Sequence, residues 1–339
     1  MGEKSRQPSV SVVVPVHDGG ADLRTCLAAI AGCVPPPLEV IVVDDASRDD
    51  SASVASAAGA RCLSSPAQRG PAHARNRGAE AASGDVVFFV DADVAIAPDA
   101  VAQVLDAFGA EPHLAAVFGS YDDAPAAPNF LSQYKNLVHH YVHQTSRPEA
   151  STFWAGCGAV RRDAFRAVSG FDETFSRPSI EDIELGGRLR KAGYDIRLRR
   201  SLQGKHLKRW EATSLLRADF CDRALPWTAL LLRNGGPPDD LNLRWSSRLS
   251  AAVACTLPVA IVAAWWWPRS LWVASALAAA LVALNWDLFA FMARKRGSGF
   301  ALRCIAWHWF YLLYSAAAFA LGVGAHLVRK SSRDGGASA

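Results

Sequence analysis

Three long stretches with almost no charged side chains occupy much of the last third of the chain. Residues 249–268 and 304–328 contain no Asp, Glu, Lys or Arg, and residues 270–293 contain only Asp287. About 20 consecutive apolar residues are enough for a helix to cross the hydrocarbon core of a bilayer. A soluble core rarely holds three such runs in succession, so the sequence predicts three transmembrane helices over these ranges.

Tryptophan positions mark an expected membrane surface. Seven of the eleven tryptophans lie within the three stretches. Four of them flank the turn at Pro268: Trp265, Trp266, Trp267 and Trp272. Because indole rings gather at the level of the lipid headgroups, this turn is expected at a membrane interface.

Net charge divides the chain in the same place. Residues 1–240 contain 26 Lys and Arg against 30 Asp and Glu, whereas residues 241–339 contain 10 against 2. The first residues are polar and do not resemble a signal peptide, so we expect the first part in the cytoplasm. Seven scattered cysteines without a Cys-x-x-Cys pair agree with that reducing compartment.

The basic loop at 293–296 then lies on the cytoplasmic side, as the positive-inside rule requires. A third crossing would place Arg329 and Lys330 outside, which the same rule disfavours. The last segment is therefore left open between a crossing and a re-entrant or interfacial segment, with three crossings favoured.

The front of the chain alternates between patterns typical of strands and of helices. Apolar runs, rich in β-branched residues at the first, predict strands over residues 10–14, 40–43, 86–90 and 114–119. Helices are expected between them, over residues 21–31, 51–58, 72–82 and 98–108. This alternation indicates an α/β layer with a mostly parallel sheet, in which ligands bind at the carboxyl ends of the strands.

Acidic residues follow two of these strands directly. Asp44 and Asp45 come after the second strand, and Asp91 and Asp93 come after the third. Carboxylates that converge on one crevice repel each other unless a cation joins them. An Asx turn leading into a helix cap is the alternative for each cluster alone. Together, the two clusters favour a site where Mg²⁺ or Mn²⁺ holds the phosphates of a substrate.

These residues and several other motifs resemble those of family 2 glycosyltransferases with the GT-A fold. The resemblance covers residues 9–210, in order and at family-like spacing. The matching stretches are Ser11–His17, Val43–Ser47, Arg69–Asn76, Asp91–Asp93, Gly156–Phe165, Gly170–Glu173 and Glu181–Leu189. It implies an inverting sugar transfer from a nucleotide-sugar donor, with Mg²⁺ or Mn²⁺ as cofactor.

The resemblance also implies roles for residues of the donor site. Asp45 is expected to read the nucleotide base, beside Asp44 and the backbone of Pro15. Asp93 is expected to bind the metal, and Asp91 to face the ribose or the metal. Further contacts with the nucleotide sugar are expected from Arg69, Asn76 and Ala92.

Asp182 resembles the catalytic base of the family. An inverting transfer needs a carboxylate that takes the proton of the acceptor hydroxyl as it attacks the anomeric carbon. The alternative is that Ser179 caps a helix whose N-terminus Glu181 and Asp182 merely stabilise. By the same resemblance, the acceptor side is expected to include Glu181, Gly156, Cys157 and Gly158.

The segment 205–210 resembles a variant of the Gln/Arg-x-x-Arg-Trp motif of membrane-bound processive members. His206 occupies the first position of this motif and is expected to bind the metal or the diphosphate. The sequence separation between Asp182 and His206 is shorter than expected for that subgroup, so processivity is left open. Phosphate and sugar contacts are expected from Lys205, Lys208, Arg209 and Trp210. A basic strip that meets anionic lipid is the alternative for the lysines.

Other polar residues have no predicted place in the site. A helix is expected over 128–147, and its histidines, His139, His140 and His143, are expected to be exposed rather than to bind a metal. Arg75 is equally compatible with a surface charge on its helix.

We therefore expect four regions. They are a GT-A domain over 1–215, an interfacial amphipathic linker over 216–247, a transmembrane region over 248–329 and a disordered tail over 330–339. The expected donor is a UDP- or GDP-sugar. The expected acceptor is lipid or lipid-linked, and polyprenyl phosphate, a glycolipid and a polysaccharide precursor all remain open.

The expected location is the cytoplasmic face of a membrane, with no nucleic-acid partner, and homo-oligomer formation is left open. A nucleotidyltransferase of related fold is one alternative, but the chain lacks a Gly-rich phosphate loop near its start. A catalytically inactive membrane scaffold is the other, although such a chain should have lost Asp182 or the Asp91–Asp93 motif.

Overall fold

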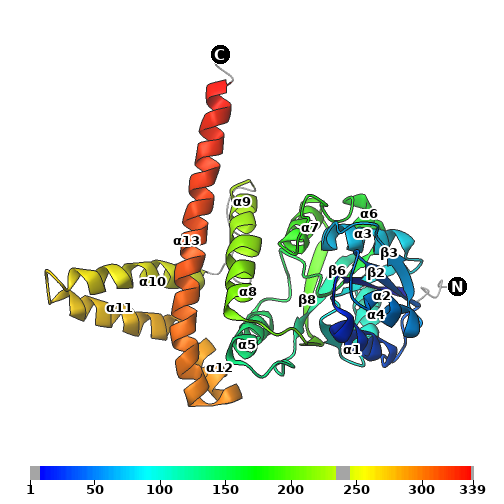
Figure 1. The fold of residues 1–339 in the computed structure, drawn as a ribbon, viewed down its shortest axis with the longest axis horizontal. Coiled ribbons are helices and arrows are strands. Elements are labelled where there is room, and N and C mark those ends of the chain that lie inside the picture. Colours follow the sequence, from blue (N-terminus) through cyan, green and yellow to red (C-terminus); the bar gives the residue numbers. More distant parts are fainter. Residues whose placement is uncertain (1–7, 234–244, 337–339) are drawn as a thin grey trace. The chain divides into compact units, whose positions relative to one another are not determined.

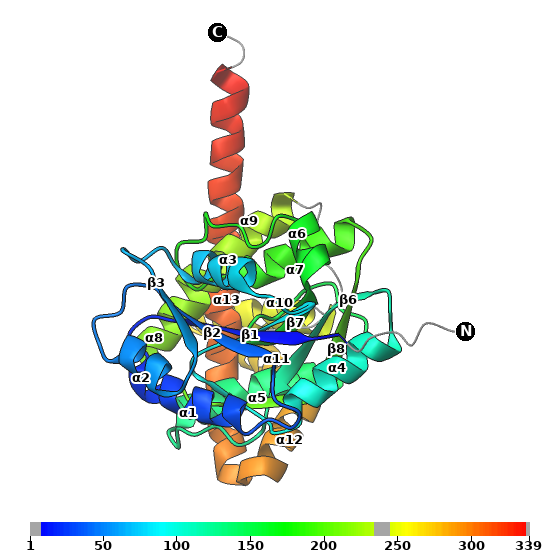
Figure 2. The same ribbon diagram turned by 90° about the vertical axis from the view of Figure 1, so that its right-hand side faces the viewer.

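The computed structural model describes residues 8–233 and 245–336. Contacts within the chain divide it into two compact units, residues 1–210 and 211–339. The division lies close to the domain boundary expected after residue 215. Figures 1 and 2 label the elements of both units.

An eight-stranded sheet forms the centre of the first unit, in the order β3-β2-β1-β4-β7-β6-β8-β5. The strands are β1 (Val10–Val16), β2 (Glu39–Asp44), β3 (Arg61–Ser64), β4 (Val86–Val90), β5 (Val94–Ile96), β6 (Leu114–Tyr121), β7 (Cys157–Arg161) and β8 (Asp195–His206). Strands β3, β2, β1 and β4 are parallel to one another, and β7 lies antiparallel between β4 and β6. β6 and β8 are again parallel.

The chain changes direction across the sheet at β1. It runs outward from β1 to β2 and β3, and then returns to β4 on the other side of β1. In such sheets the crevice beyond the carboxyl ends of the strands on either side of this switch is the usual ligand site. The fold therefore directs attention to the residues that follow β1, β2 and β4.

Helices cover both faces of the sheet. They are α1 (Gly20–Ala31), α2 (Ser51–Ala57), α3 (Pro71–Ala81), α4 (Ala100–Ala110), α5 (Phe130–Thr145), α6 (Arg162–Ala167) and α7 (Glu181–Lys191). Figure 2 shows α3, α6 and α7 on one face and α1, α2 and α4 on the other.

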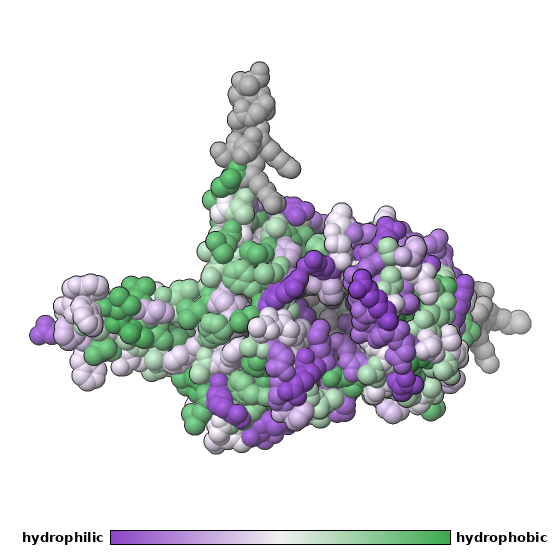
Figure 3. Space-filling model, viewed as in Figure 1, coloured by the Kyte–Doolittle hydropathy of each residue, from purple (hydrophilic) through white to green (hydrophobic). Residues whose placement is uncertain are grey.

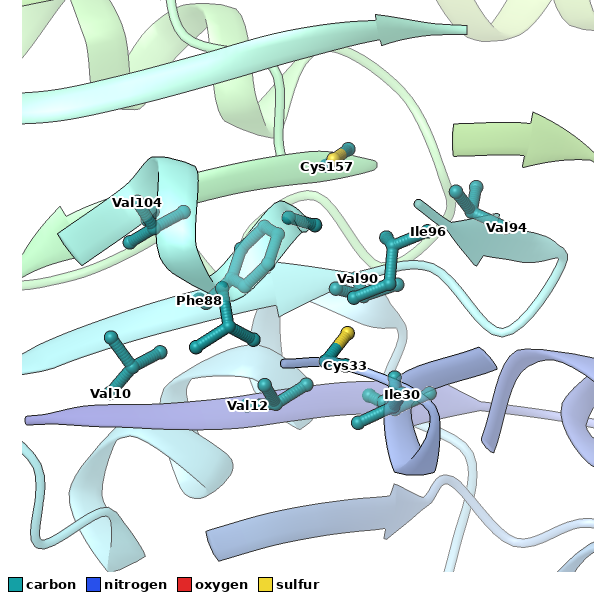
Figure 4. Packing of buried hydrophobic residues seen from close by; sticks show 14 of the residues in the cluster. Val10, Val12, Ile30, Cys33, Phe88, Val90, Val94, Ile96, Val104 and Cys157 are labelled. Atoms are coloured by element: carbon teal, nitrogen blue, oxygen red, sulfur yellow. The ribbon is translucent and has the colours of Figure 1, made fainter. Parts of the chain in front are cut away.

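The alternation of side chains along β1 explains this arrangement. Val10 and Val12 point to the face of α1 and α4, where they join a buried cluster with Phe88 of β4 and Val104 of α4 (Figure 4). Val13 points to the opposite face, against Gly78 of α3, where any Cβ would collide with it. Each fully buried side chain of this size contributes about 1.5–3 kcal/mol.

The four strands and four helices expected in the first half of this unit are present as β1, β2, β4, β6, α1, α2, α3 and α4, within a few residues of the expected bounds. Strands β3, β5, β7 and β8 were not expected from the sequence. β8 was hidden because arginines and other polar residues alternate with its few apolar ones. β3 and β5 have only four and three residues.

The second unit is helical. Its elements are α8 (Ala212–Arg217), the π-helical turn η1 (Ala218–Ala224), α9 (Leu225–Arg233), α10 (Trp245–Ala263), α11 (Ser270–Leu284), α12 (Trp286–Arg296) and α13 (Ser298–Gly336). The linker expected over 216–247 is thus helical up to Arg233, and residues 234–244 lie outside the described residues. α13 continues through Gly336, so it runs past residue 330, where a disordered tail was expected.

Two helices among the described residues are long and apolar enough to cross a membrane, α10 and the part of α13 over Ser298–Val328. α11 and α12 make a third only if this pair, which is bent by 65°, forms one span. The single helix expected over 270–293 is therefore broken, at Asn285, whose side-chain amide donates to the carbonyl of Leu281. Figure 3 shows hydrophobic residues over α10 and α11.

Candidate active site

Strand-end acids lie at one edge of the sheet. Asp44 ends β2, Asp45 follows it, and Asp91 follows β4. The backbone N–H of Asp45 donates to the carbonyl of Val16 at the end of β1, at 2.8 Å. Because β1, β2 and β4 are parallel, these residues share the carboxyl edge on both sides of β1.

The carboxylate of Asp45 organises the loop before α3. It accepts hydrogen bonds from the backbone N–H groups of Arg69 (2.9 and 3.1 Å) and Gly70 (2.7 Å). Gly70 has φ +95°, and a Cβ there would overlap the backbone of Ser176, so only glycine fits. Asp44 holds its own loop by accepting from the N–H of Ser47 at 2.9 Å. Contact of either acid with a nucleotide base stays a prediction.

Glu173 joins α3 to the loop that follows α6. It accepts from Arg69 at 3.2 Å, from the side-chain amide of Asn76 at 3.0 Å, and lies 2.8 Å from Nδ1 of His73. Asn76 also exchanges two hydrogen bonds with the backbone of Phe171, at 2.8 and 2.9 Å. The amide of Asn76 is thus occupied by the protein, while Arg69 is still more than half exposed.

Two further residues expected near the nucleotide lie at the same edge. Pro15 is paired with Val43 near the ends of β1 and β2. Ala92 lies in the short turn between β4 and β5 and is partly exposed. Both positions are compatible with the expected role, which stays a prediction.

Asp93 and His206 lie next to each other beyond β4 and β8. His206 Nε2 lies 3.7 Å from Asp93 Oδ2. Val94 is paired with His206, and the N–H of Leu207 donates to the Asp93 carbonyl at 2.8 Å, so two strands fix this contact. Burial alone would raise the pKa of Asp93, but the hydrogen bond and charge of His206, together with Lys208, hold this pKa below its ordinary value.

Aromatic side chains hold the imidazole of His206 in place. The ring of Tyr121 stacks on it, with centroids 4.2 Å apart and planes within 21°. Trp154 packs edge-on against Tyr121 at 4.8 Å. His206 is only 4% exposed, so its ring has little room to turn away from Asp93.

The histidines of α5 were expected to be exposed, and this prediction is wrong. His140 and His143 are buried, and their Nδ1 atoms lie 2.7 and 2.9 Å from the carbonyl oxygens of Tyr121 and Gly119 in β6. His139 packs between Tyr121 and Trp154. The prediction failed because the polar ring atoms are satisfied by the backbone of a neighbouring strand, which a sequence pattern does not reveal.

A divalent cation fits part of the expected ligand set. Within residues 8–233 and 245–336, no three His, Cys, Asp or Glu side chains are arranged as metal ligands. Asp93 and His206 nevertheless offer one oxygen and one nitrogen 3.7 Å apart. Two ligands that each bind a cation at about 2.1 Å lie at most about 4.2 Å from each other. Asp91 has one oxygen engaged by Arg75, so only its other oxygen is open to a cation.

The first turn of α7 holds Asp182. Its carboxylate accepts from the N–H of Ala155 at 3.1 Å and from that of Ile183 at 2.8 Å. Burial and then the charge of Glu181 raise the pKa of Asp182 to about 7, while Arg75 and the two N–H groups oppose this rise. A carboxylate with this pKa can exchange a proton near neutral pH.

Arg75 connects these parts of the site. It is 5% exposed, and its guanidinium donates to Glu181 at 2.8 Å and to Asp91 at 2.7 Å. Burial raises the pKa of Asp91, against the opposing charge of Arg75. The acid after β4 and the acids at the start of α7 thus share one ionic network.

The expected acceptor side begins at β7. The carbonyl of Gly156 accepts from the N–H of Asp91 at 3.1 Å, so this residue borders the acidic edge. Cys157 is fully buried in the core and Gly158 lies against the backbone of Trp154. These placements position β7 beside Asp91, and a contact of Gly156, Cys157 or Gly158 with an acceptor stays a prediction.

The basic residues after His206 have different surroundings. Lys205 forms an ion pair with Asp122 at 3.1 Å and donates to the carbonyl of Ala124. Lys208 lies over the ring of Trp210, 4.4 Å from its centroid, and Trp210 is buried. Lys208 is therefore better placed than Lys205 to meet a phosphate near Asp93, and Arg209 stays a prediction.

Comparison with known proteins agrees with this geometry. Residues 11–169 match the model of glycosyl transferase family 2. The pre-mycofactocin glycosyltransferase of Mycobacterium tuberculosis is 30% identical over 260 residues, which are 72% of this chain and 50% of that protein. The chain belongs to glycosyl transferase family 2.

Other family 2 relatives show how much of each protein is shared. The O-antigen biosynthesis protein RfbC of Myxococcus xanthus is 30% identical over 200 residues, or 53% of this chain and 14% of RfbC. The chain thus spans half the length of the mycobacterial relative and a smaller part of RfbC.

The structural comparison supports the GT-A fold. The mannosyltransferase PcManGT of Pyrobaculum calidifontis, solved with GDP-Man and Mn²⁺, is 20% identical and superposes with a TM-score of 0.59, over 93% of this chain and 88% of its own. GalNAc-T7, solved with UDP, GalNAc and Mn²⁺, is 15% identical with a TM-score of 0.51, over 68% and 48%. The GT-A fold expected from the sequence is confirmed.

Arg75 is the residue of this family 2 domain that the sequence analysis underestimated. A signal for its burial is present: Ala72, Gly78 and Ala79 share its face of α3 at helical spacing, and all three are small and buried. A surface arginine would not be surrounded by such residues. Glu173 was not predicted either, although it lies in the stretch Gly170–Glu173 that resembles the family.

Proposed function

We propose that this protein is an inverting, metal-dependent glycosyltransferase that moves a sugar from a nucleotide-sugar donor to a lipid or lipid-linked acceptor. The observation that carries the proposal is the position of Asp182. Its carboxylate is held by two backbone N–H groups and is linked through Glu181 and Arg75 to Asp91 at the donor edge of the sheet.

The residues of the site divide the chemistry between them. Asp182 takes the proton of the acceptor hydroxyl as that oxygen attacks the anomeric carbon. Asp93 and His206 are the residues that would hold a divalent cation, with Asp91 beside them. When bound, such a cation stabilises the negative charge of the departing diphosphate. Tyr121 keeps the His206 ring facing Asp93.

The pKa of Asp182 predicts how the activity depends on pH. Because a base acts in its deprotonated form and this pKa is about 7, kcat/KM is expected to fall about tenfold per pH unit on the acid side of neutrality, and kcat is expected to fall with the pKa of the substrate complex. The measurements are kcat/KM and kcat from pH 5.5 to 9. A flat profile between pH 5.5 and 7 would argue against Asp182 as the base.

A lipid acceptor is proposed because of the second unit. Two or three of its helices are apolar enough to span a membrane. The turn between α10 and α11 exposes four indole rings, Trp265, Trp266, Trp267 and Trp272, each more than half exposed. Rings of this kind are typical of a membrane interface. We place the catalytic unit and the basic end of α12 on the cytoplasmic side, in a multi-pass arrangement.

Membrane insertion has a direct test with a matched pair of sites. The full chain is expected to stay in the membrane pellet after an alkaline carbonate wash. Arg269→Cys, at the exposed turn after α10, should react with a membrane-impermeant maleimide in intact cells, whereas Ser298→Cys should react only after lysis. Release by carbonate, or equal labelling of both sites in intact cells, would contradict this topology.

The activity is tested by a screen of donors and acceptors. UDP-, GDP- and dTDP-sugars, GDP-mannose among them, are tested with Mn²⁺ for thermal stabilisation of the purified full chain. Donors that stabilise it are then incubated with a glycolipid that presents a free hydroxyl and, separately, with polyprenyl phosphate, and nucleotide release and lipid-linked product are measured. The proposal expects turnover with at least one donor. Stabilisation by none of them would favour an inactive scaffold. Release of a sugar 1-phosphate in place of a nucleoside diphosphate would favour a nucleotidyltransferase.

A further inference from the structure

Arg75 lies inside the first unit although it carries a full charge. A guanidinium is excluded from a protein interior unless its charge is paired there. Two carboxylates pair it, Asp91 after β4 and Glu181 at the start of α7, and the ring of Phe171 lies 5.5 Å away. The two acids belong to elements far apart in the sequence, so Arg75 joins segments that the sheet alone does not join.

The partners of Arg75 differ in their access to a ligand. Glu181 is 4% exposed, and its second oxygen accepts from the N–H of Ser179 at 2.8 Å, so the whole carboxylate is used within the protein. Asp91 has one oxygen on Arg75, and its side chain is 30% exposed. A line of direct contacts therefore leads from a ligand-accessible acid, through a buried arginine, to the residue beside Asp182.

We propose that Arg75 is a positioning residue that fixes the first turn of α7 relative to Asp91, so that the site for the donor and the base Asp182 keep one mutual geometry. This inference rests on the proposed function. It assigns Glu181 to the same device rather than to a contact with acceptor or phosphate. It also gives a role to the oxygen of Asp91 that accepts from Arg75.

The same arrangement sets the electrostatics around Asp182. The charged groups that face its carboxylate are Glu181, on the same turn, and Arg75, from α3. Glu181 raises the pKa of Asp182 and Arg75 lowers it. Loss of either charge should therefore move the pKa of the base, and the two losses should move it in opposite directions.

The test uses three variants and a control in the full chain: Arg75→Met, Arg75→Lys, Glu181→Gln and the control Arg77→Met. Arg77 is on the same helix but donates to Ser64 and Ser65 at the end of β3, and not to Asp91 or Glu181. Hydrogen–deuterium exchange is measured over residues 179–185. Arg75→Met and Arg75→Lys should raise exchange there about tenfold, because a local opening becomes easier. Peptides of β1 and β4, and the 179–185 peptides of Arg77→Met, should be unchanged.

The pH profile of kcat separates positioning from general destabilisation. Glu181→Gln should move the acid limb to lower pH and Arg75→Met should move it to higher pH, each by about one unit. Arg75→Lys keeps the charge but reaches only one carboxylate. The acid limb of its pH profile should therefore stay near that of the wild type, while its kcat should fall more than about tenfold. Limbs that stay unchanged in both charge variants, or that move in the same direction, overturn the inference.

Two further cases also test the inference: a variant that does not fold, and a wild type without measurable turnover. If Arg75→Met does not fold, Arg75→Lys and Glu181→Gln carry the test, and wild-type exchange together with wild-type kcat in Arg75→Lys overturns the inference. If the wild type turns over no donor in the screen, the proposed function fails. The exchange of residues 179–185 then still shows whether Arg75 holds α7, and unchanged exchange in both Arg75 variants rejects it.

Discussion

Replacing Asp182 by asparagine is expected to reduce kcat by about 10²–10⁴-fold, the usual contribution of a general base. The amide keeps the shape of the side chain and one accepting oxygen, but its NH2 group faces the other backbone N–H, of Ala155 or Ile183. We therefore expect a loss of about 1–3 kcal/mol of stability, with nucleotide affinity nearly unchanged. The measurements are kcat with the donor found in the screen and the dissociation constant of its nucleotide by calorimetry. The acid limb of the pH profile should disappear with the activity.

Asp163→Asn is the matched control for this variant. Asp163 also lies in the first turn of a helix and accepts from a backbone N–H, but it is exposed. Its kcat should equal that of the wild type. Loss of nucleotide affinity with retained turnover in Asp182→Asn would show that Asp182 belongs to the donor site and not to the acceptor side.

Asp93→Asn is expected to abolish tight binding of Mn²⁺ and to lower kcat by about 10³-fold, because a bound cation supplies several kcal/mol of charge stabilisation to the leaving group. Asp93 is the carboxylate nearest to His206, and asparagine replaces its charge by a neutral amide. Binding of Mn²⁺ to the full chain with UDP or GDP present is followed by electron paramagnetic resonance, which needs no turnover.

An acid outside the site provides the comparison. Asp106→Asn, on the exposed surface of α4, should leave both the Mn²⁺ signal and kcat unchanged. An Asp93→Asn variant that remains fully active in EDTA, or a wild type that does, would remove the metal from the proposed mechanism.

The sequence was informative wherever local pattern decides the structure. Runs of β-branched residues predicted β1, β2 and β4 because these strands are buried on both faces. The acids directly after them could be placed at one edge because parallel strands end together. Asp93 and His206, 113 positions apart, were assigned to one metal by resemblance, and the structure places them 3.7 Å apart.

The remainder depends on contacts between distant segments. The burial of Arg75 is set by Asp91 and Glu181, and neither lies on its helix. His140 and His143 are buried because carbonyl groups of β6 satisfy them. An α-helical pattern shows which residues share a face but does not show what that face meets.

The break in the apolar stretch 270–293 had another cause. By composition and length this stretch is sufficient for one membrane span, although the structure shows it as two helices. At the bend lies Asn285, whose side chain donates to the carbonyl of Leu281 and to the hydroxyl of Ser250 on α10. Hydropathy averaged over the run does not show where such a polar residue interrupts it.

The anomeric configuration of the product tests the central claim most directly. The purified full chain is incubated with its donor and acceptor, and the new glycosidic linkage is determined by proton nuclear magnetic resonance before any rearrangement. A single displacement with Asp182 as base predicts the configuration opposite to that of the donor. A product that retains the configuration of the donor would contradict the account.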